Sequence, residues 1–333
     1  MINKAYDKIT TYIKENFKFL LTLIILFFIC TFELPYYIDT PGGLIDIATR
    51  VNIDNSQRSE GSLNLAYVTE FRATLPTLLI ASINKDWDIL KKEEIVANNE
   101  TLEEIDYRNH LLLEESKDNA TIIGFKKANQ YYQITNRKVN IVYLYEEADT
   151  NLKIGDQIIK INNTKINSKK DVFDIIQNSK KQLEITVLHD NKQHIRYANK
   201  INIGSKELLG IILCETKDID TNNKINFNFH PSESGPSGGF MMALSIYNYL
   251  TEEDITNGLK IVGTGTIDEM GNIGSIGGIS YKIKAAVKKD ADIFFAPSEN
   301  FKEAQETVLN NQLNIKLIEV KHIDEAIEYL NNL

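Results

Sequence analysis

A long apolar run near the N-terminus is the strongest feature in the pattern of hydrophobic and polar positions. Residues 19–32 carry no charge, and Lys18 and Glu33 stand at the borders. As a helix these residues span about 21 Å, which is less than the ~30 Å hydrocarbon core of a bilayer. Flanking residues bring the length close to that requirement when Lys18 extends its ammonium group to the interface. The pattern therefore predicts an N-terminal transmembrane helix at residues 17–37.

The residues on either side of this run predict its orientation. A cleaved signal peptide is the competing interpretation, but the segment CTFELPYYIDT contains no small-x-small cleavage site, and the residues before Cys30 make a poor lipoprotein site. Lysines precede the run and carboxylates follow it, so the positive-inside rule keeps residues 1–16 in the cytoplasm. The predicted location is the cell membrane, as a single-pass protein whose working part is extracellular.

The segment at residues 38–137 changes pattern several times. DTPGG at 39–43 predicts a turn, and the runs IATRVNI and SLNLAYVTEF predict strands. A helical pattern then occupies roughly residues 75–133, where Thr101 and Glu104 have the spacing of a capping box. We expect this region of strands and helices to pack with the C-terminal part of the chain.

Residues 138–200 predict a small α+β module of strand, acidic loop, strand, turn, helix and strand. The stretch ADTNLKIGDQIIKINNTKI resembles bacterial PDZ domains, in which a Leu-x-x-Gly-Asp turn precedes an Ile-rich strand and an Asn turn. The resemblance implies binding of extended peptide ends by addition of a strand to a sheet edge. A carboxylate-binding loop is not clearly present, so no groove residues are assigned.

Residues 201–333 alternate strands and helices and predict an α/β layer arrangement. Within them, ESGPSGG places Ser237 directly before an apolar helical pattern at 238–250. A serine at this position is either the N-cap of that helix or a nucleophile, and the local sequence favours neither. The glycines permit close approach of a ligand, and the helix N-terminus supplies amide donors for an oxyanion, with Gly238 as a candidate.

A nucleophilic serine needs a base, and two candidates compete. GPSGG matches the G-x-S-x-G elbow, which requires a later histidine, and only His322 follows. The elbow also needs a strand running straight into the serine, whereas HPSES is a loop pattern. In GGISYKIKAAVKK, a helix starting at Ile279 places Lys282 on the apolar side with Ala286. Burial lowers the pKa of a lysine, so Lys282 is the better base, although a lysine snorkelling at the helix start is the alternative.

Composition excludes several classes of function. The net charge of −9 argues against nucleic acid as a partner. With only two cysteines and no H-E-x-x-H pattern, the sequence predicts no zinc or other metal site. The dipeptide Gly-Lys does not occur, so a Walker A motif is absent from this chain. We therefore expect no cofactor.

The segments GPSGGFMMAL, VGTGTID and GNIGSIGGISYKIKAA resemble the proteolytic domain of Lon proteases, which use a Ser-Lys dyad. The resemblance implies that Ser237 is the nucleophile, that Lys282 is the general base and that Thr264 orients the lysine. Many Lon enzymes carry an acidic residue three positions before the serine, where this chain has Ser234. That difference leaves open which acidic group, if any, orients the dyad.

Taken with the N-terminal run and the PDZ-like insert, the chain is similar to the membrane-anchored, PDZ-containing Lon-like peptidases of Gram-positive bacteria, which lack an ATPase module. We therefore expect a multidomain α/β (α+β) protein that works as an ATP-independent serine endopeptidase. Its expected partners are a peptide or unfolded protein substrate and the membrane, and Lon domains often assemble into homo-oligomeric rings. The alternative is a catalytically silent, membrane-tethered PDZ adaptor that binds peptides.

Overall fold

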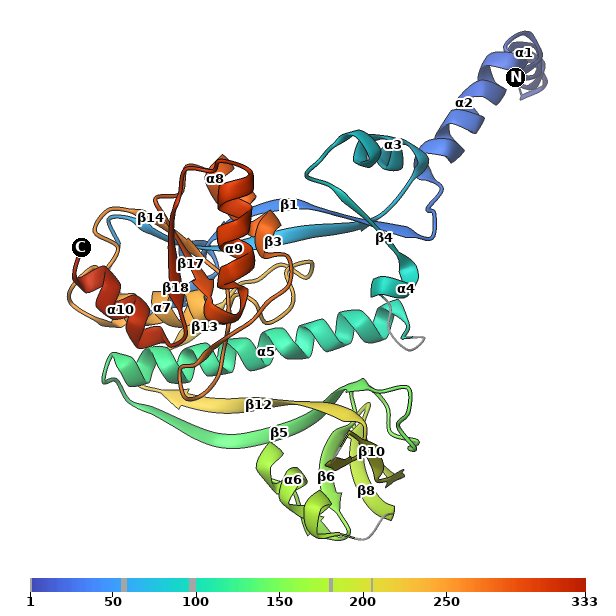
Figure 1. Cartoon of the computed structure of the whole chain (residues 1–333). Coiled ribbons are helices and arrows are strands. Elements are labelled where there is room, and N and C mark those ends of the chain that lie inside the picture. The colour runs from blue at the N-terminus through green and yellow to red at the C-terminus, as the bar shows by residue number, and fades with distance from the viewer. Residues whose placement is uncertain (1, 55–58, 96–99, 180–181, 205) are drawn as a thin grey trace. The chain divides into compact units, whose positions relative to one another are not determined.

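The computed structural model describes residues 2–54, 59–95, 100–179, 182–204 and 206–333. The chain forms two compact units (Figure 1). Unit 1 consists of residues 1–41 and 68–95, and unit 2 consists of residues 42–67 and 96–333. Two long strands, β1 (Tyr36–Asp46) and β3 (Ser62–Arg72), contribute residues to both units.

Besides the ends of β1 and β3, the described residues of unit 1 form the helices α1 (Ile2–Glu15), α2 (Phe17–Thr31), α3 (Leu75–Ile83) and α4 (Lys92–Ile95) and the short strand β4 (Asp88–Lys91). Strand β4 pairs antiparallel with the start of β1. Ile38, Ala73 and Ala81 form a small core against the ring of Trp87.

The predicted membrane span coincides with α2 only in part. The helix ends at Thr31, and Tyr36 already belongs to β1. Pro35 disfavours helical backbone at Leu34, so the helix cannot continue to residue 37. Among the described residues, none of the helices has the length and apolarity that crossing a membrane requires.

The predicted turn at DTPGG is wrong, because these residues lie inside β1. Gly42 and Gly43 pack against the ring of Tyr67 in β3, and a Cβ atom at Gly42 would lie 2.5 Å from the Tyr67 carbonyl oxygen. The glycine pair therefore provides a flat surface for a neighbouring strand. Glycine pairs are typical both of turns and of strand surfaces on which a neighbouring side chain packs closely. Here the ring of Tyr67 in the neighbouring strand decides between the two.

The main sheet of unit 2 has the order β18-β17-β14-β3-β1. Strands β14 (Lys260–Gly263), β17 (Ile293–Pro297) and β18 (Lys316–Val320) run parallel to one another, and β3 is parallel to β14. Two smaller antiparallel pairs accompany this sheet, namely β2 (Val51–Ile53) with β13 (Ile225–Phe227) and β15 (Thr266–Ile267) with β16 (Ile273–Gly274).

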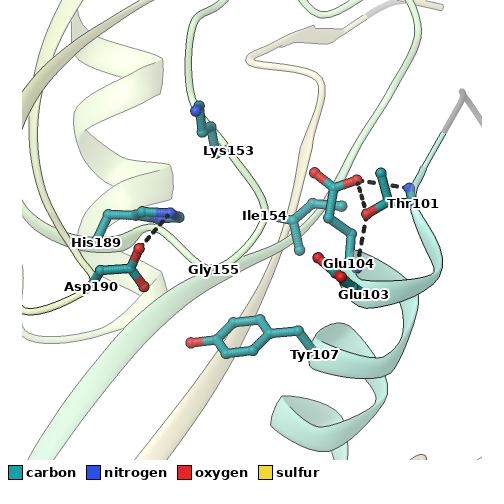
Figure 2. Close-up of a pocket in the computed structure, with 9 residues that line it drawn as sticks. All are labelled: Thr101, Glu103, Glu104, Tyr107, Lys153, Ile154, Gly155, His189 and Asp190. Atoms are coloured by element: carbon teal, nitrogen blue, oxygen red, sulfur yellow. Dashed lines mark hydrogen bonds and ion pairs between the residues drawn. The ribbon is translucent and has the colours of Figure 1, made fainter.

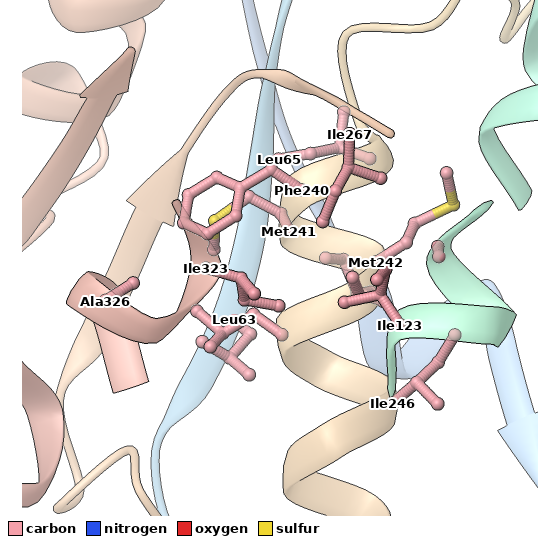
Figure 3. Packing of buried hydrophobic residues seen from close by; sticks show 14 of the residues in the cluster. Leu63, Leu65, Ile123, Phe240, Met241, Met242, Ile246, Ile267, Ile323 and Ala326 are labelled. Atoms are coloured by element: carbon pink, nitrogen blue, oxygen red, sulfur yellow. The ribbon is translucent and has the colours of Figure 1, made fainter. Parts of the chain in front are cut away.

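Helices cover both faces of this sheet. On one face, α5 (Leu102–Lys127), α7 (Gly239–Leu250) and α10 (Ile323–Asn331) share a core with Ile261 and Phe295. Figure 3 shows the α7 side chains of this core between β3, α5 and α10. On the other face, α8 (Ile279–Lys288) and α9 (Ser298–Asn310) pack on Val262 and Phe294. Strands buried on both faces are continuously apolar, and every residue of β17 is buried.

The remaining part of unit 2 is a second sheet with the order β12-β5-β6-β8-β9. Its elements are β5 (Tyr132–Leu144), β6 (Gln157–Ile161), β7 (Thr164–Lys165), α6 (Lys169–Asn178), β8 (Gln182–His189), β9 (Lys192–Asn199) and β12 (Ile211–Thr221), with a separate hairpin of β10 (Ile201–Ile203) and β11 (Lys206–Leu208). The order of strands and helix follows the sequence prediction. The mixed α/β fold class is confirmed.

Candidate active site

Ser237 lies immediately before α7 but does not cap it. The N-cap position is Gly238, and no side chain caps this helix. Ser237 is partly exposed, whereas the residues that follow it are buried. The interpretation of Ser237 as a helix cap is therefore wrong, and the serine hydroxyl is not used in capping α7.

Two backbone carbonyls around Ser237 are anchored on the inner side of the loop. The carbonyl of Pro236 accepts hydrogen bonds from Gly239 N and from Ser116 Oγ, both at 3.2 Å. The carbonyl of Ser237 accepts from Gly265 N at 2.8 Å and from Thr264 Oγ1 at 3.2 Å. Each peptide plane before and after the serine is thus held by two donors.

These anchors determine where the amide groups point. In a trans peptide the N–H lies opposite the carbonyl, so the N–H groups of Ser237 and Gly238 point away from the anchors. Within the described part of the chain, neither amide has a hydrogen-bond acceptor. Two unpaired amides at a helix N-terminus form an arrangement that can bind a negatively charged oxygen.

Lys282 lies in the first turn of α8 and is 4% exposed. Its Nζ donates a hydrogen bond to Thr264 Oγ1 at 3.1 Å, and no carboxylate of the described residues forms an ion pair with it. Desolvation by the surrounding protein lowers the pKa of Lys282 to about 8. A substantial fraction of this lysine is therefore neutral near pH 8 and able to accept a proton.

Thr264 connects the two sides of the sheet. It directly follows β14, is fully buried, and bonds both to Lys282 on α8 and to the loop before α7. Helices α7 and α8 lie on opposite faces of the sheet, so the serine and the lysine approach from opposite sides of the β14 carboxyl end. Among the described residues, no direct hydrogen bond joins Ser237 Oγ and Lys282 Nζ; the connection between them runs through Thr264.

Residues distant in the sequence hold the loop that leads into Ser237. Glu233 forms a bidentate ion pair with Arg50 at 2.7 and 2.8 Å, and Gly235 N donates to the carbonyl of Asn109 at 3.1 Å. The hydrogen bonds from Arg50 lower the pKa of Glu233. The acidic residue beside Ser234 is thus engaged in fixing the loop. Neither Arg50 nor Ser116 carried a signal in the sequence that pointed to this site.

The competing base, His322, has a structural position. Its Nδ1 accepts the backbone N–H of Asp324 as the N-cap of α10, and its Nε2 lies 2.9 Å from the carbonyl of Met270. Both ring nitrogens are therefore occupied at a helix terminus. The histidine-dependent elbow mechanism is not supported by this arrangement.

Cavities lined by described residues border α5 on two sides. The first, of about 510 Å³, lies between α5 and the loop at residues 229–233, and its apolar lining consists of Tyr107, Leu113, Phe229 and Pro231. The second, of about 370 Å³, lies between α5 and the loop at 153–155 (Figure 2). His189 borders this second cavity, and its Nδ1 lies 2.9 Å from Oδ1 of the fully buried Asp156, the Asp of the LKIGD motif. The other carboxylate oxygen of Asp156 accepts a hydrogen bond from Lys153 N at 2.8 Å. That motif therefore has a structural function in its turn.

The edges of the second sheet are mostly covered. On β12, the N–H groups of Glu215 and Lys217 donate to the α5 carboxylates of Glu115 and Asp118 at 2.8 and 2.6 Å. On β9, Tyr197 N bonds to the side chain of Asn151, and the amide of Asn199 bonds to the carbonyl of Asp149. Peptide binding at a sheet edge stays a prediction, and on β9 the described backbone leaves room for it around residues 193–195.

The C-terminal part of the chain has clear relatives. Residues 228–332 match the Lon protease (S16) C-terminal proteolytic domain. A Lon protease of Elusimicrobium minutum (strain Pei191) is 29% identical over 157 residues, which cover 44% of this chain and 19% of that protein. A Lon protease of Aster yellows witches'-broom phytoplasma (strain AYWB) is 35% identical over 122 residues, which cover 34% of this chain and 15% of that protein. The chain therefore spans less than a fifth of the length of these relatives, and the similarities support a serine peptidase.

Proposed function

We propose that this protein is an ATP-independent serine endopeptidase in which Ser237 is the nucleophile and Lys282 is the general base. The observation that carries this proposal is the buried Lys282, which has no ion-pair partner among the described residues and bonds to Thr264 at 3.1 Å. Thr264 in turn bonds to the carbonyl of Ser237 at 3.2 Å. A buried lysine with a lowered pKa next to a serine is the arrangement that activates a hydroxyl nucleophile.

In the proposed reaction, the neutral amine of Lys282 removes the hydroxyl proton of Ser237. The Ser237 Oγ forms a bond to the scissile carbonyl carbon, and the carbonyl oxygen becomes an oxyanion that the amides of Ser237 and Gly238 bind. Lys282 then delivers its proton to the departing amine, and the C–N bond breaks. A water molecule, deprotonated by Lys282, hydrolyses the acyl-enzyme and regenerates the serine. Ser237 Oγ has no hydrogen bond to another described residue, so it is free to rotate toward the lysine.

The substrate class follows from the surroundings of Ser237. The cavity between α5 and residues 229–233 offers apolar side chains beside the nucleophile loop, where an extended peptide can lie. This chain contains no Walker A motif. We therefore expect cleavage of extended or locally unfolded segments.

The lysine-rich residues before the apolar run support an N-terminus in the cytoplasm, a membrane anchor at α2 and a peptidase outside the cell.

The alternative function is a tethered adaptor that binds peptides without cutting them. The covered edge of β12, and of β9 at residues 197–199, weighs against it, because strand addition needs unpaired backbone. The combination of unpaired amides, Thr264 and a buried lysine with a lowered pKa also has no use in an adaptor. We therefore favour the peptidase.

The test uses the full chain in detergent micelles with an unfolded protein such as casein, without ATP. Peptides released by the wild type and lost in Ser237→Ala, but kept in Ser82→Ala at an exposed serine of unit 1, would support the proposal. Equal release by wild type and Ser237→Ala would reject Ser237 as the nucleophile. If neither cleaves, a serine-reactive phosphonate probe that labels the wild type and not Ser237→Ala separates narrow specificity from a silent site.

A further inference from the structure

Helix α3 is composed mainly of apolar residues, although only part of it is covered by protein. Its sequence LPTLLIASI contains no charged residue. Leu78 and Ala81 face the small core of unit 1 beside Trp87. The opposite side exposes large apolar side chains, namely Leu75 (47%), Leu79 (63%), Ile80 (46%) and Ile83 (83%).

A helix that is hydrophobic all round is normally buried, either in a protein core or in a membrane. The same unit contains a second such helix, because none of the residues of α2 is buried and its only charged residue is Lys18. Leu34 N, just after α2, donates to the carbonyl of Ala73, just before α3, at 2.8 Å. Arg72 forms an ion pair with Glu33 at 2.8 Å. These bonds join the end of α2 to the start of α3, which lie side by side in Figure 1.

We infer that α3 is a membrane-interface helix, whose exposed side lies in the boundary between headgroups and hydrocarbon at the end of α2. This inference rests on the anchor in the proposed function. A 15-residue α2 is about 22 Å long and falls short of a ~30 Å bilayer core. The side chains of an interfacial helix reach about 5–10 Å into the lipid, so α3 extends the apolar surface where α2 ends.

A lipid fits this surface better than a protein partner does. Whatever inserts α2 into hydrocarbon also brings α3 to the membrane surface, because a backbone hydrogen bond and a side-chain ion pair join the segments at their ends. The exposed side of α3 offers mainly aliphatic groups; its exposed Ser82 donates its hydroxyl to the carbonyl of Leu79 within the helix at 2.8 Å. Protein interfaces, in contrast, carry a rim of hydrogen-bonding side chains. Polar residues return after the helix, at Asn84, Lys85 and Asp86.

The experiment places a fluorescent NBD group at single cysteines in the full chain, reconstituted in phosphatidylcholine–phosphatidylglycerol vesicles with and without nitroxide-labelled lipid. The background is Cys30→Ser, since Cys214 is fully buried. Leu79→Cys and Ile83→Cys report on α3, Phe28→Cys reports on α2, and Leu309→Cys is an exposed apolar control on α9 of unit 2. The single tryptophan, Trp87, packs edge-on against Phe71 and shows by its emission whether unit 1 stays folded in each variant.

We expect nitroxide lipid to quench the labels on α2 and α3 at least twofold more than the label on α9. If Phe28→Cys is quenched while Leu79→Cys and Ile83→Cys behave like Leu309→Cys, the inference is wrong and the anchor stands. If none of the labels is quenched, α2 is not a membrane anchor, and the inference that α3 lies at the membrane interface is rejected as well. Rapid disulfide formation between two copies of Leu79→Cys, without quenching, would assign the surface to a second copy and also overturn the inference.

Discussion

The hydroxyl oxygen of Thr264 lies 3.1 Å from Nζ of Lys282 and accepts a hydrogen bond from it. The same hydroxyl donates its proton to the carbonyl of Ser237 at 3.2 Å. One threonine at the end of β14 thus orients the lysine of one helix layer and the backbone of the serine in the other. The relative position of nucleophile and base depends on this side chain.

The pH dependence of cleavage follows from the pKa of Lys282, which desolvation lowers to about 8. The base must be neutral, so the rate falls as the pH drops below that value. We expect kcat/KM to decrease about tenfold per pH unit below pH 8 and to level off above it. Initial rates measured with a quenched peptide substrate from pH 6 to 9.5 test this, and a rate that rises toward acid pH would contradict a lysine base.

Replacing Lys282 by methionine is expected to stabilise the fold while abolishing cleavage. The pKa of Lys282 is about 8 in the folded protein, compared with 10.5 for an ordinary lysine. Between these two values the unfolded chain binds more protons than the folded protein does. At pH 7 the buried ammonium group therefore lowers the stability of the fold. Lys282→Met should raise the free energy of unfolding by about 1–3 kcal/mol at pH 7, a gain that disappears as the pH rises through 10.5. Urea unfolding at pH 7 and pH 10, with exposed Lys288→Met as the control, measures this difference.

Thr264→Val keeps the shape of the side chain and removes both hydrogen bonds. We expect kcat to fall by about 10²-fold, because the lysine and the Ser237 carbonyl both lose a partner. Loss of the acceptor for the ammonium group should also move the midpoint of the pH–rate profile to lower pH. Thr264→Ser should restore most of the rate. An unchanged midpoint in Thr264→Val would show that this hydroxyl does not act on Lys282.

Ser116→Ala removes one of the two donors that hold the Pro236 carbonyl. The amide of Ser237 should then be less well oriented toward an oxyanion, which lowers kcat about 3- to 10-fold and leaves KM nearly unchanged. Thr121→Val is the matched control, because the Thr121 hydroxyl bonds within α5 to the carbonyl of Lys117. Equal effects of both changes on kcat would indicate general damage to α5 instead of positioning.

Gly239 is required by close packing at the start of α7. A Cβ atom there would lie 2.5 Å from Ser116 Oγ and 3.1 Å from a methyl group of Ile267. Gly239→Ala should therefore displace the helix start and reduce kcat at least about tenfold, since the amides at this helix end are aligned for the oxyanion. Gly277→Ala, where an added Cβ meets no atom within 4 Å, should retain the rate. Full activity of Gly239→Ala would show that the helix start tolerates this displacement.

Several local features were predictable from the sequence because short-range periodicity decides them. The spacing of Ile279, Ile283 and Ala286 predicted the buried side of α8, and Lys282 is buried with them. Thr101 and Glu104 form the capping box that their spacing indicated. Residues within one helical turn share a face regardless of the rest of the fold, so such predictions need no tertiary information.

Other features depended on distant parts of the chain. Arg50 reaches Glu233 across 183 positions, and Ser116 reaches Pro236 across 120. Gly42 and Gly43 predicted a turn, but Tyr67 of the neighbouring strand makes them a flat surface within β1. Local sequence cannot separate these outcomes, since the contacts that decide them form only when the chain is folded.

By itself, the sequence determined which residues can do chemistry: a serine before a glycine-rich helix start and a lysine on the apolar side of a helix. Only the tertiary structure decided how they relate. It placed their helices on opposite faces of one sheet, inserted Thr264 between them, and turned the amides of Ser237 and Gly238 outward by anchoring the carbonyls beside them. The physical reason is that side-chain type and helical phase are local properties, whereas the direction of a hydrogen bond depends on partners that the fold brings from far along the chain.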